Sequence, residues 1–138
     1  MYHHLLSMSG LQVLVVDGNL DSQYLLSMLF QMYGIETIAT DSVSEALNIL
    51  EQVQPDLLIS ELLLTEEDGF SLMQKVKALG QLKNLQIPAV ALTTYITDEI
   101  HRYALAVGFC RCLCKPLLLD ELLTVVAQLT GKVLLPAS

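Results

Sequence analysis

The sequence has few basic residues. Lys and Arg account for 7 of 138 residues, against 15 Asp and Glu, so the formal net charge is −8. A protein that binds nucleic acid clusters Lys and Arg against the phosphates, and the only close lysine pair here is Lys75 and Lys77. The composition therefore argues against nucleic-acid binding.

The sequence also lacks the segments that direct a chain to a membrane. No apolar run approaches the roughly 20 residues that span a bilayer, and the first ten residues do not have the charged and apolar regions of a signal peptide. A cytoplasmic, reducing location is the expectation, with Cys110, Cys112 and Cys114 as free thiols. Because they alternate along one strand, we expect the three cysteines to share a face, as small buried residues under the last helix. A Gly-rich phosphate-binding loop is missing too, which makes a nucleotide- or flavin-binding protein a minor alternative.

What the chain does have is apolar content for one core. It is 53% hydrophobic, and its length fits a single domain. We expect this domain to occupy 1–138, with its core at about 10–131 and short extensions at both ends.

Strand-like and helix-like segments alternate five times, which predicts an α/β fold with a parallel sheet. The strand-like runs are mostly apolar without polar alternation, as expected for strands covered on both faces. They are Leu11–Asp17, Ile35–Thr40, Asp56–Glu61, Ile87–Thr93 and Phe109–Cys114.

The segments that follow these runs carry apolar residues at helical spacing, the pattern of amphipathic helices. The stripes are Tyr24, Leu25, Met28, Leu29 and Met32; Val43, Ala46, Leu47 and Leu50; Leu72, Met73, Val76 and Leu79; Ile96, Ile100, Tyr103, Ala104 and Val107; and Leu119, Leu122, Leu123, Val126 and Leu129. Ser42 or Asp41 is placed to cap the second helix.

Four polar residues stand at or just after strand ends: Asp17, Glu61, Thr93 and Lys115. In open parallel sheets, ligands bind outside the carboxyl ends of the strands. We therefore expect these four side chains to meet at one edge of the sheet.

These residues and their surroundings resemble the receiver domains of two-component response regulators, the CheY-like family. The resemblance lies in Leu14–Asp17, the acceptor segment Pro55–Gly69, the fourth strand Ile87–Thr94, and Lys115-Pro116, whose peptide bond is typically cis in the family. It implies a flavodoxin-like (βα)5 doubly wound sandwich with a five-stranded parallel sheet of order 2-1-3-4-5.

Receivers accept a phosphoryl group on an aspartate, with Mg²⁺ held by an acidic pair. Here Gly18 stands at the second member of that pair, and Glu61 stands in place of the acceptor, which moves its carboxylate outward by roughly 1.5 Å. Such a displacement costs about a hundredfold in rate. We expect weak Mg²⁺ binding at best, through Asp17 and Glu61. Asp21 is a helix-start residue rather than a substitute ligand.

Lys115 and Thr93 match the residues that bind the phosphoryl oxygens in the family. One hypothesis is that Lys115 pairs with Glu61 while Thr93 lies near the same carboxylate, which would imitate part of the phosphorylated arrangement. The alternative is a purely structural ion pair at the rim of a pocket. The sequence leaves both open.

Two further departures concern the switch itself. Thr65 replaces a proline that is usual after the acceptor, and Cys112 replaces the aromatic residue that usually reports the state of the switch threonine. The expected output face includes Tyr103, Cys112 and Pro116. The unusually apolar run 117–119 is consistent either with an interface there or with a cap on the sheet.

The resulting prediction is a stand-alone, non-enzymatic pseudo-receiver that acts through protein–protein contact, independently of aspartyl phosphorylation. Its partner would be a histidine kinase, another regulator or an effector. A homodimer would form through the face of the fourth helix, fifth strand and fifth helix. The alternative is a still-switchable regulator of a phosphorelay, phosphorylated at or near Glu61.

Overall fold

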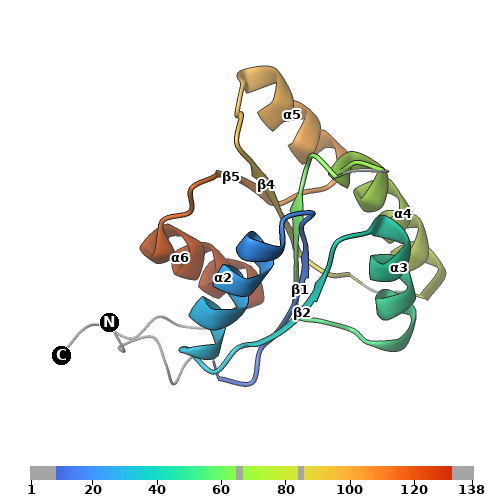
Figure 1. Cartoon of the computed structure of the whole chain (residues 1–138). Coiled ribbons are helices and arrows are strands. Elements are labelled where there is room, and N and C mark those ends of the chain that lie inside the picture. Colours follow the sequence, from blue (N-terminus) through green and yellow to red (C-terminus); the bar gives the residue numbers. More distant parts are fainter. Residues whose placement is uncertain (1–8, 65–66, 84–85, 132–138) are drawn as a thin grey trace.

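The computed structural model describes residues 9–64, 67–83 and 86–131. Strands and helices alternate along these ranges (Figure 1). In chain order the elements are β1 (Gln12–Val16), α2 (Leu20–Gln31), β2 (Glu36–Thr40), α3 (Val43–Gln52), β3 (Leu57–Glu61), α4 (Gly69–Lys83), β4 (Ala89–Thr93), α5 (Asp98–Val107), β5 (Arg111–Cys114) and α6 (Leu119–Thr130). The predicted switch-loop position Thr65 lies outside the described residues.

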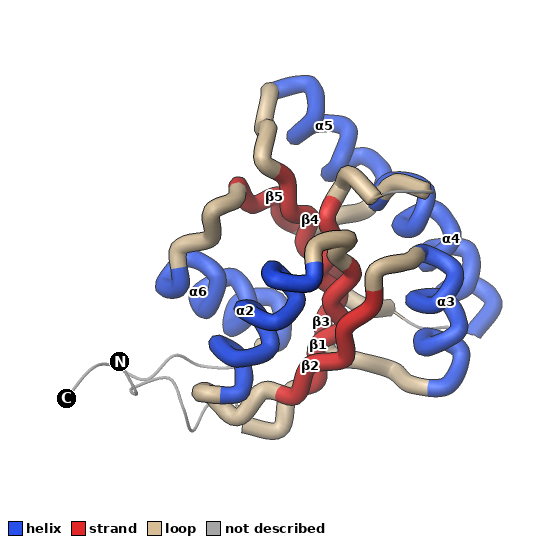
Figure 2. Tube along the Cα trace, viewed as in Figure 1, coloured by secondary structure: helices blue, strands red, loops and turns tan. Residues whose placement is uncertain are grey.

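The strands form one parallel sheet of order β2-β1-β3-β4-β5, which confirms the predicted fold and strand order. Each predicted strand is present, and each is shorter than predicted by one or two residues in total. Val16 pairs with Ser60, and Thr93 pairs with Cys114, so the strands end almost level. Figure 2 shows the sheet as the central layer between two layers of helices.

Side chains alternate across the sheet, so the strands supply two separate cores. Val13, Val15 and Ile59 face α2 and α6. Leu14 and Leu58 face α3, α4 and α5. All five are fully buried, which explains why the strand sequences are apolar throughout.

Side-chain caps fix where several helices begin. Asn19 accepts a hydrogen bond from the Ser22 N–H at α2, and Ser42 accepts one from the Glu45 N–H at α3. These caps satisfy backbone donors that a helix start leaves free. Ser42, rather than Asp41, is therefore the cap of α3.

The predicted core stripe of α2 was wrong. Tyr24, Leu25, Met28 and Met32 are exposed, and the residues that α2 buries are Leu26 and Phe30. The helix has two rows of apolar residues at i, i+4 spacing, and only the row through Leu26 and Phe30 packs on the sheet. Periodicity alone does not say which of two such rows faces inward.

The cysteines were also placed on the wrong side of the sheet. The expectation was small buried residues under the last helix, but Cys112 packs in the core beneath α5, together with Ala104 and Phe109. Leu113, its neighbour on β5, faces α6 instead. All three cysteines are free thiols.

Candidate functional site

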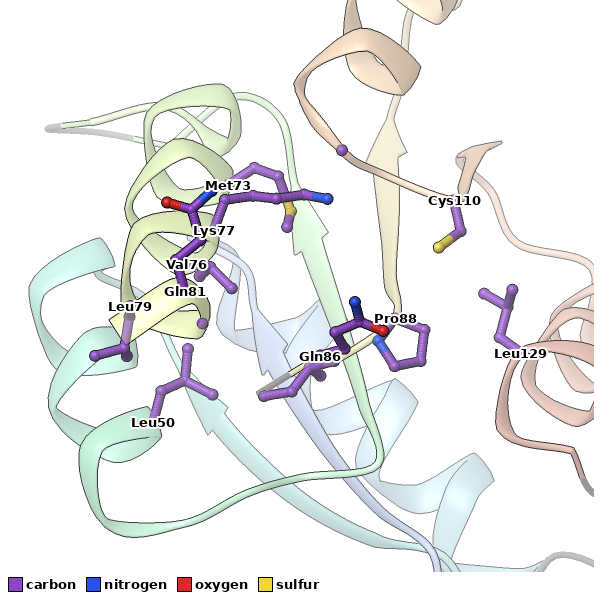
Figure 3. A pocket seen from close by; sticks show the side chains of 13 residues that line it. Leu50, Met73, Val76, Lys77, Leu79, Gln81, Gln86, Pro88, Cys110 and Leu129 are labelled. Atoms are coloured by element: carbon purple, nitrogen blue, oxygen red, sulfur yellow. The ribbon is translucent and has the colours of Figure 1, made fainter. Parts of the chain in front are cut away.

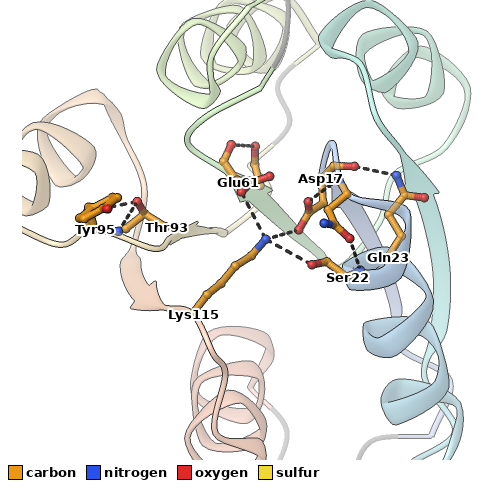
Figure 4. A network of polar contacts seen from close by, with 9 residues as sticks. Asp17, Ser22, Gln23, Glu61, Thr93, Tyr95 and Lys115 are labelled. Atoms are coloured by element: carbon orange, nitrogen blue, oxygen red, sulfur yellow. Dashed lines mark hydrogen bonds and ion pairs between the residues drawn. The ribbon is translucent and has the colours of Figure 1, made fainter.

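The carboxyl end of the sheet brings three charged side chains together. Asp17 follows β1, Glu61 ends β3, and Lys115 follows β5. The Lys115 Nζ lies 2.7 Å from Asp17 Oδ2 and 3.3 Å from Glu61 Oε1. Figure 4 shows Lys115 pointing between the two carboxylates. The Lys115–Glu61 ion pair is therefore present, but the shorter contact is with Asp17.

Asp17 is fully buried and held by its neighbours. Its Oδ1 accepts a hydrogen bond from the Asn19 N–H at 2.9 Å, while its backbone oxygen accepts one from the Gln23 side-chain amide at 2.6 Å. Ser22 Oγ lies 3.5 Å from the Lys115 Nζ. These three partners at the start of α2 were missed from the sequence. The Asn-x-x-Ser spacing of a helix cap was the signal that could have found them.

Glu61 is partly buried, and the electrostatics around it are opposed. Burial raises the pKa of the Glu61 carboxyl above its ordinary value, and the adjacent Asp17 carboxylate raises it further. Lys115 acts in the other direction and lowers it. The net direction is upward, so the folded protein holds a proton on Glu61 more readily than the unfolded chain does.

Thr93 does not share in this cluster of charges. Its hydroxyl donates to the backbone oxygen of Tyr95 at 3.1 Å and accepts from the Tyr95 N–H at 3.2 Å. Figure 4 shows these two residues bonded to each other, to one side of Lys115. Thr93 is buried, and its bonds stabilise the turn after β4.

Two glycines shape the site in different ways. A Cβ added at Gly18 would have no heavy atom within 4 Å, so there is room for a side chain beside Asp17. A Cβ at Gly69 would lie 2.5 Å from the Glu61 backbone oxygen. Only glycine lets the start of α4 pack this closely on the end of β3.

The expected output face is mixed in its exposure. Tyr103 is half exposed and packs on Phe70, with 4.6 Å between ring centroids, while Cys112 is buried. The Lys115-Pro116 peptide bond is cis. Within the run 117–119 only Leu118 is strongly exposed, because its two neighbours pack against the core.

A pocket of about 650 Å³ lies at the opposite end of the sheet (Figure 3). Its walls include Met73 and Lys77 of α4, Pro88 before β4, and Cys110 before β5. None of the four residues predicted at the strand ends lines it. Among the described residues, no three His, Cys, Asp or Glu side chains are grouped to hold a metal. In the same ranges, no helix has the length and apolarity to cross a bilayer.

The comparisons with known proteins agree on one family. The family model for the response regulator receiver domain matches residues 13–127. An uncharacterized 14.6 kDa protein of Leptolyngbya boryana, named for its place 3′ of sodA1, is 35% identical over 88% of this chain and 92% of its own length. The sensor histidine kinase RcsC of Salmonella typhi is 28% identical over 92% of this chain, which spans only 13% of that kinase.

Solved structures show the same likeness in three dimensions. A two-component response regulator from Clostridium difficile superposes with a TM-score of 0.81 at 26% sequence identity. The aligned part covers 88% of this chain and 96% of that one. The likeness therefore extends across the whole sheet and the helices on both of its faces.

Proposed function

The chain belongs to the response regulator receiver domain family, and we propose that it is a signalling module whose input no longer depends on phosphorylation of an aspartate. Glu61 occupies the acceptor position of β3, and it acts as one partner of an internal ion-pair cluster. In this proposal the protein is a pseudo-receiver, which keeps the receiver shape and transmits a signal by binding another protein.

The observation that carries the proposal is the place of the Lys115 ammonium group. It contacts Asp17 and Glu61 at once, at 2.7 and 3.3 Å. A lysine in this position offsets one of the two carboxylate charges in the pocket without an incoming phosphoryl group. Phosphotransfer would have to break the contact with Glu61 and move an attacking atom that is already displaced by one methylene.

The residues present do not fit the Mg²⁺ that receivers use. Both side-chain oxygens of Asp17 already accept hydrogen bonds, from Asn19 and from Lys115. Gly18 offers no ligand where the family has a second acid. A cation would therefore have to compete with Lys115 for the same carboxylates. Any binding through Asp17 and Glu61 should be weak.

The position of Thr93 favours a structural role for the ion pair over imitation of the phosphorylated state. The Thr93 hydroxyl is engaged with Tyr95 on both its donor and acceptor sides. An imitation of that state would need this hydroxyl to turn toward Glu61. We infer that Glu61 does not by itself hold the switch in its active form.

Partner binding is assigned to the face made by α5, β5 and α6. Tyr103, Leu105 and Leu118 are exposed there, and Tyr95 and Ile96 are exposed in the loop before α5. Receivers bind protein partners, and a histidine kinase, a second regulator or an effector would suit this face. Because Cys112 is small and buried, an aromatic switch residue on β5 does not take part in the contact.

The experiment is to incubate the purified chain with acetyl phosphate and Mg²⁺ and to measure its intact mass. The matched variant carries Gly18→Asp and Glu61→Asp together, which restores both acids of the family. The space at Gly18 accepts the new side chain. We expect no adduct on the natural chain and the mass of one phosphoryl group on the variant.

An adduct on the natural chain would refute the proposal. It would support the alternative of a switchable regulator phosphorylated at or near Glu61. Replacing Glu61 with Gln should then abolish the adduct if this residue is the acceptor. Mg²⁺ titration of both proteins would show whether Gly18→Asp and Glu61→Asp also restore metal binding.

A further inference from the structure

The outer face of α2 gathers most of its exposed apolar side chains, with Asp21 and Gln31 as the exposed polar residues on the same arc of the helix. Its side chains are Leu20, Tyr24, Leu25, Met28 and Met32, with exposed fractions of 71%, 68%, 57%, 47% and 63%. The sheet-facing row of the same helix, through Leu26 and Phe30, already supplies its core contacts. Exposed apolar side chains gathered in this way mark contact surfaces. We name these five residues the α2 patch.

The charges around the patch restrict what covers it. Asp21 is the only charged residue of α2, and the helix carries no basic residue. A partner that placed acidic groups on the patch would lose their hydration and meet the like charge of Asp21, and Asp21 offers a basic partner only a single opposite charge. The patch therefore fits a surface that is itself apolar and uncharged. The chain carries such a surface in the patch itself, and the repulsion between two copies of net charge −8 is reduced when salt screens it.

The spacing of the patch makes it complementary to itself. Leu20, Tyr24, Met28 and Met32 recur every four residues, so the row is symmetric about a point midway between Tyr24 and Met28. In an antiparallel pair of α2 helices around a two-fold axis, Leu20 faces Met32 of the other copy. In the same way Tyr24 faces Met28, which gives two favourable sulfur–aromatic contacts.

The available area suits a modest dimer. At roughly 100 Å² or more for each exposed side chain, the patch offers about 500–600 Å² per copy. Two copies then reach about 1,000–1,200 Å² before the polar rim is counted, which is the lower end of specific interfaces.

We propose that the α2 patch pairs with the α2 patch of a second copy, as an isologous, two-fold dimer with antiparallel helices. The contact lies on the side of the sheet covered by α2 and α6. The patch shares no residue with the α5–β5–α6 face, where the sequence led us to expect a homodimer, and in this proposal that face is free to bind a different protein. This separates self-association from partner binding, and it does not depend on whether Glu61 accepts phosphate.

The test is sedimentation velocity of the full chain from about 1 μM to about 500 μM, which spans moderate and weak dimers. We expect a shift from one to two copies as concentration rises. Met28→Glu and Tyr24→Lys should each weaken the dimer by at least about tenfold, because each buries an unpaired charge. Leu118→Glu, on the α5–β5–α6 face, is the matched control and should not change it.

A mixture gives the sharpest result. When the Met28→Glu and Tyr24→Lys chains are combined, the two introduced charges face each other across the proposed axis, and the opposite contact keeps its natural residues. The mixture should therefore dimerise more tightly than either variant alone. Far-ultraviolet circular dichroism and thermal melts establish that both variants fold, as expected for exposed positions.

Several outcomes would overturn the proposal. The natural chain could stay monomeric throughout the range, which would leave the patch to a different protein. Leu118→Glu could abolish the dimer while Met28→Glu does not, which would place the contact on the α5–β5–α6 face. A mixture of folded variants that stays as weak as its components would refute the predicted pairing.

Discussion

Replacing Lys115 with Met should destabilise the fold substantially at neutral pH. The substitution keeps most of the side-chain volume but removes the ammonium group, and leaves Asp17 fully buried beside Glu61. Breaking a buried ion pair costs about 3–5 kcal/mol, and the partial exposure of Lys115 and Glu61 reduces this to about 2–4 kcal/mol. The measurement is the free energy of unfolding from urea titration.

The same loss should depend on pH in a defined direction. With Lys115 gone, burial and Asp17 still raise the pKa of Glu61, and the opposing effect of the Lys115 ammonium group is lost. A carboxyl whose pKa is higher in the folded state than in the unfolded state holds its proton more tightly when folded. Stability therefore falls as pH rises from the ordinary value of 4.5 through the raised folded pKa. The deficit of the variant should be smaller near pH 4.5 than at neutral pH.

Two controls separate this effect from a general loss of packing. Lys75→Met removes a lysine from an exposed pair with Glu67, and it should leave the unfolding curve almost unchanged. Adding Glu61→Gln to Lys115→Met should recover part of the lost stability and flatten its pH dependence. A Lys115→Met chain as stable as the natural one, or equally weakened at both pH values, would refute the electrostatic account of this site.

Other predictions follow from packing. Gly69→Ala should lower the free energy of unfolding by about 1–3 kcal/mol, because the added Cβ would lie 2.5 Å from a backbone oxygen. Gly18→Ala should change the same quantity by less than about 0.5 kcal/mol, because nothing lies within 4 Å of its added Cβ. Equal losses of stability for the two variants in urea titration would contradict this. Phe30→Ala should lower the free energy of unfolding by about 3–5 kcal/mol, because Phe30 is buried. Tyr24→Ala should lower it by less than about 0.5 kcal/mol at low protein concentration, because Tyr24 is exposed. The reverse order would mean that α2 presents its other apolar row to the sheet. The Cys112 thiol should be the slowest of the three to react with a disulfide reagent in the native state, since burial raises its pKa, and rapid labelling would show that it is accessible.

Much of the fold could be predicted because the strands are so strongly marked. Runs such as those around Val15 and Ile59 are apolar on both faces, which occurs where helices cover a parallel sheet on both sides. The Ser42 cap marked the start of α3 in the same local way. Element type was therefore readable from short stretches, and only the terminal residues of the strands were misplaced.

Which face of a helix or strand packs against the core could not be predicted as well from the sequence. Sequence spacing gives two apolar rows on α2, and the choice of Phe30 for the core depends on the sheet beneath α2 and on α6, which covers the same face of the sheet. Cys112 was assigned to the wrong layer for a related reason. A period of two shows that alternate residues share a face, but it does not say which helix covers that face.

By itself, the sequence determined the fold family and the identity of the groups at the strand ends, because both follow from residue type and local pattern. Only the tertiary structure decided how those groups are paired. Lys115 lies 98 residues from Asp17 along the chain and 54 from Glu61, and it meets both carboxylates only because β1, β3 and β5 end at the same edge of the sheet. Thr93 ends at that edge as well, yet its hydroxyl bonds to Tyr95. The backbone N–H and oxygen of Tyr95, two residues along the chain, already satisfy the Thr93 hydroxyl as donor and acceptor.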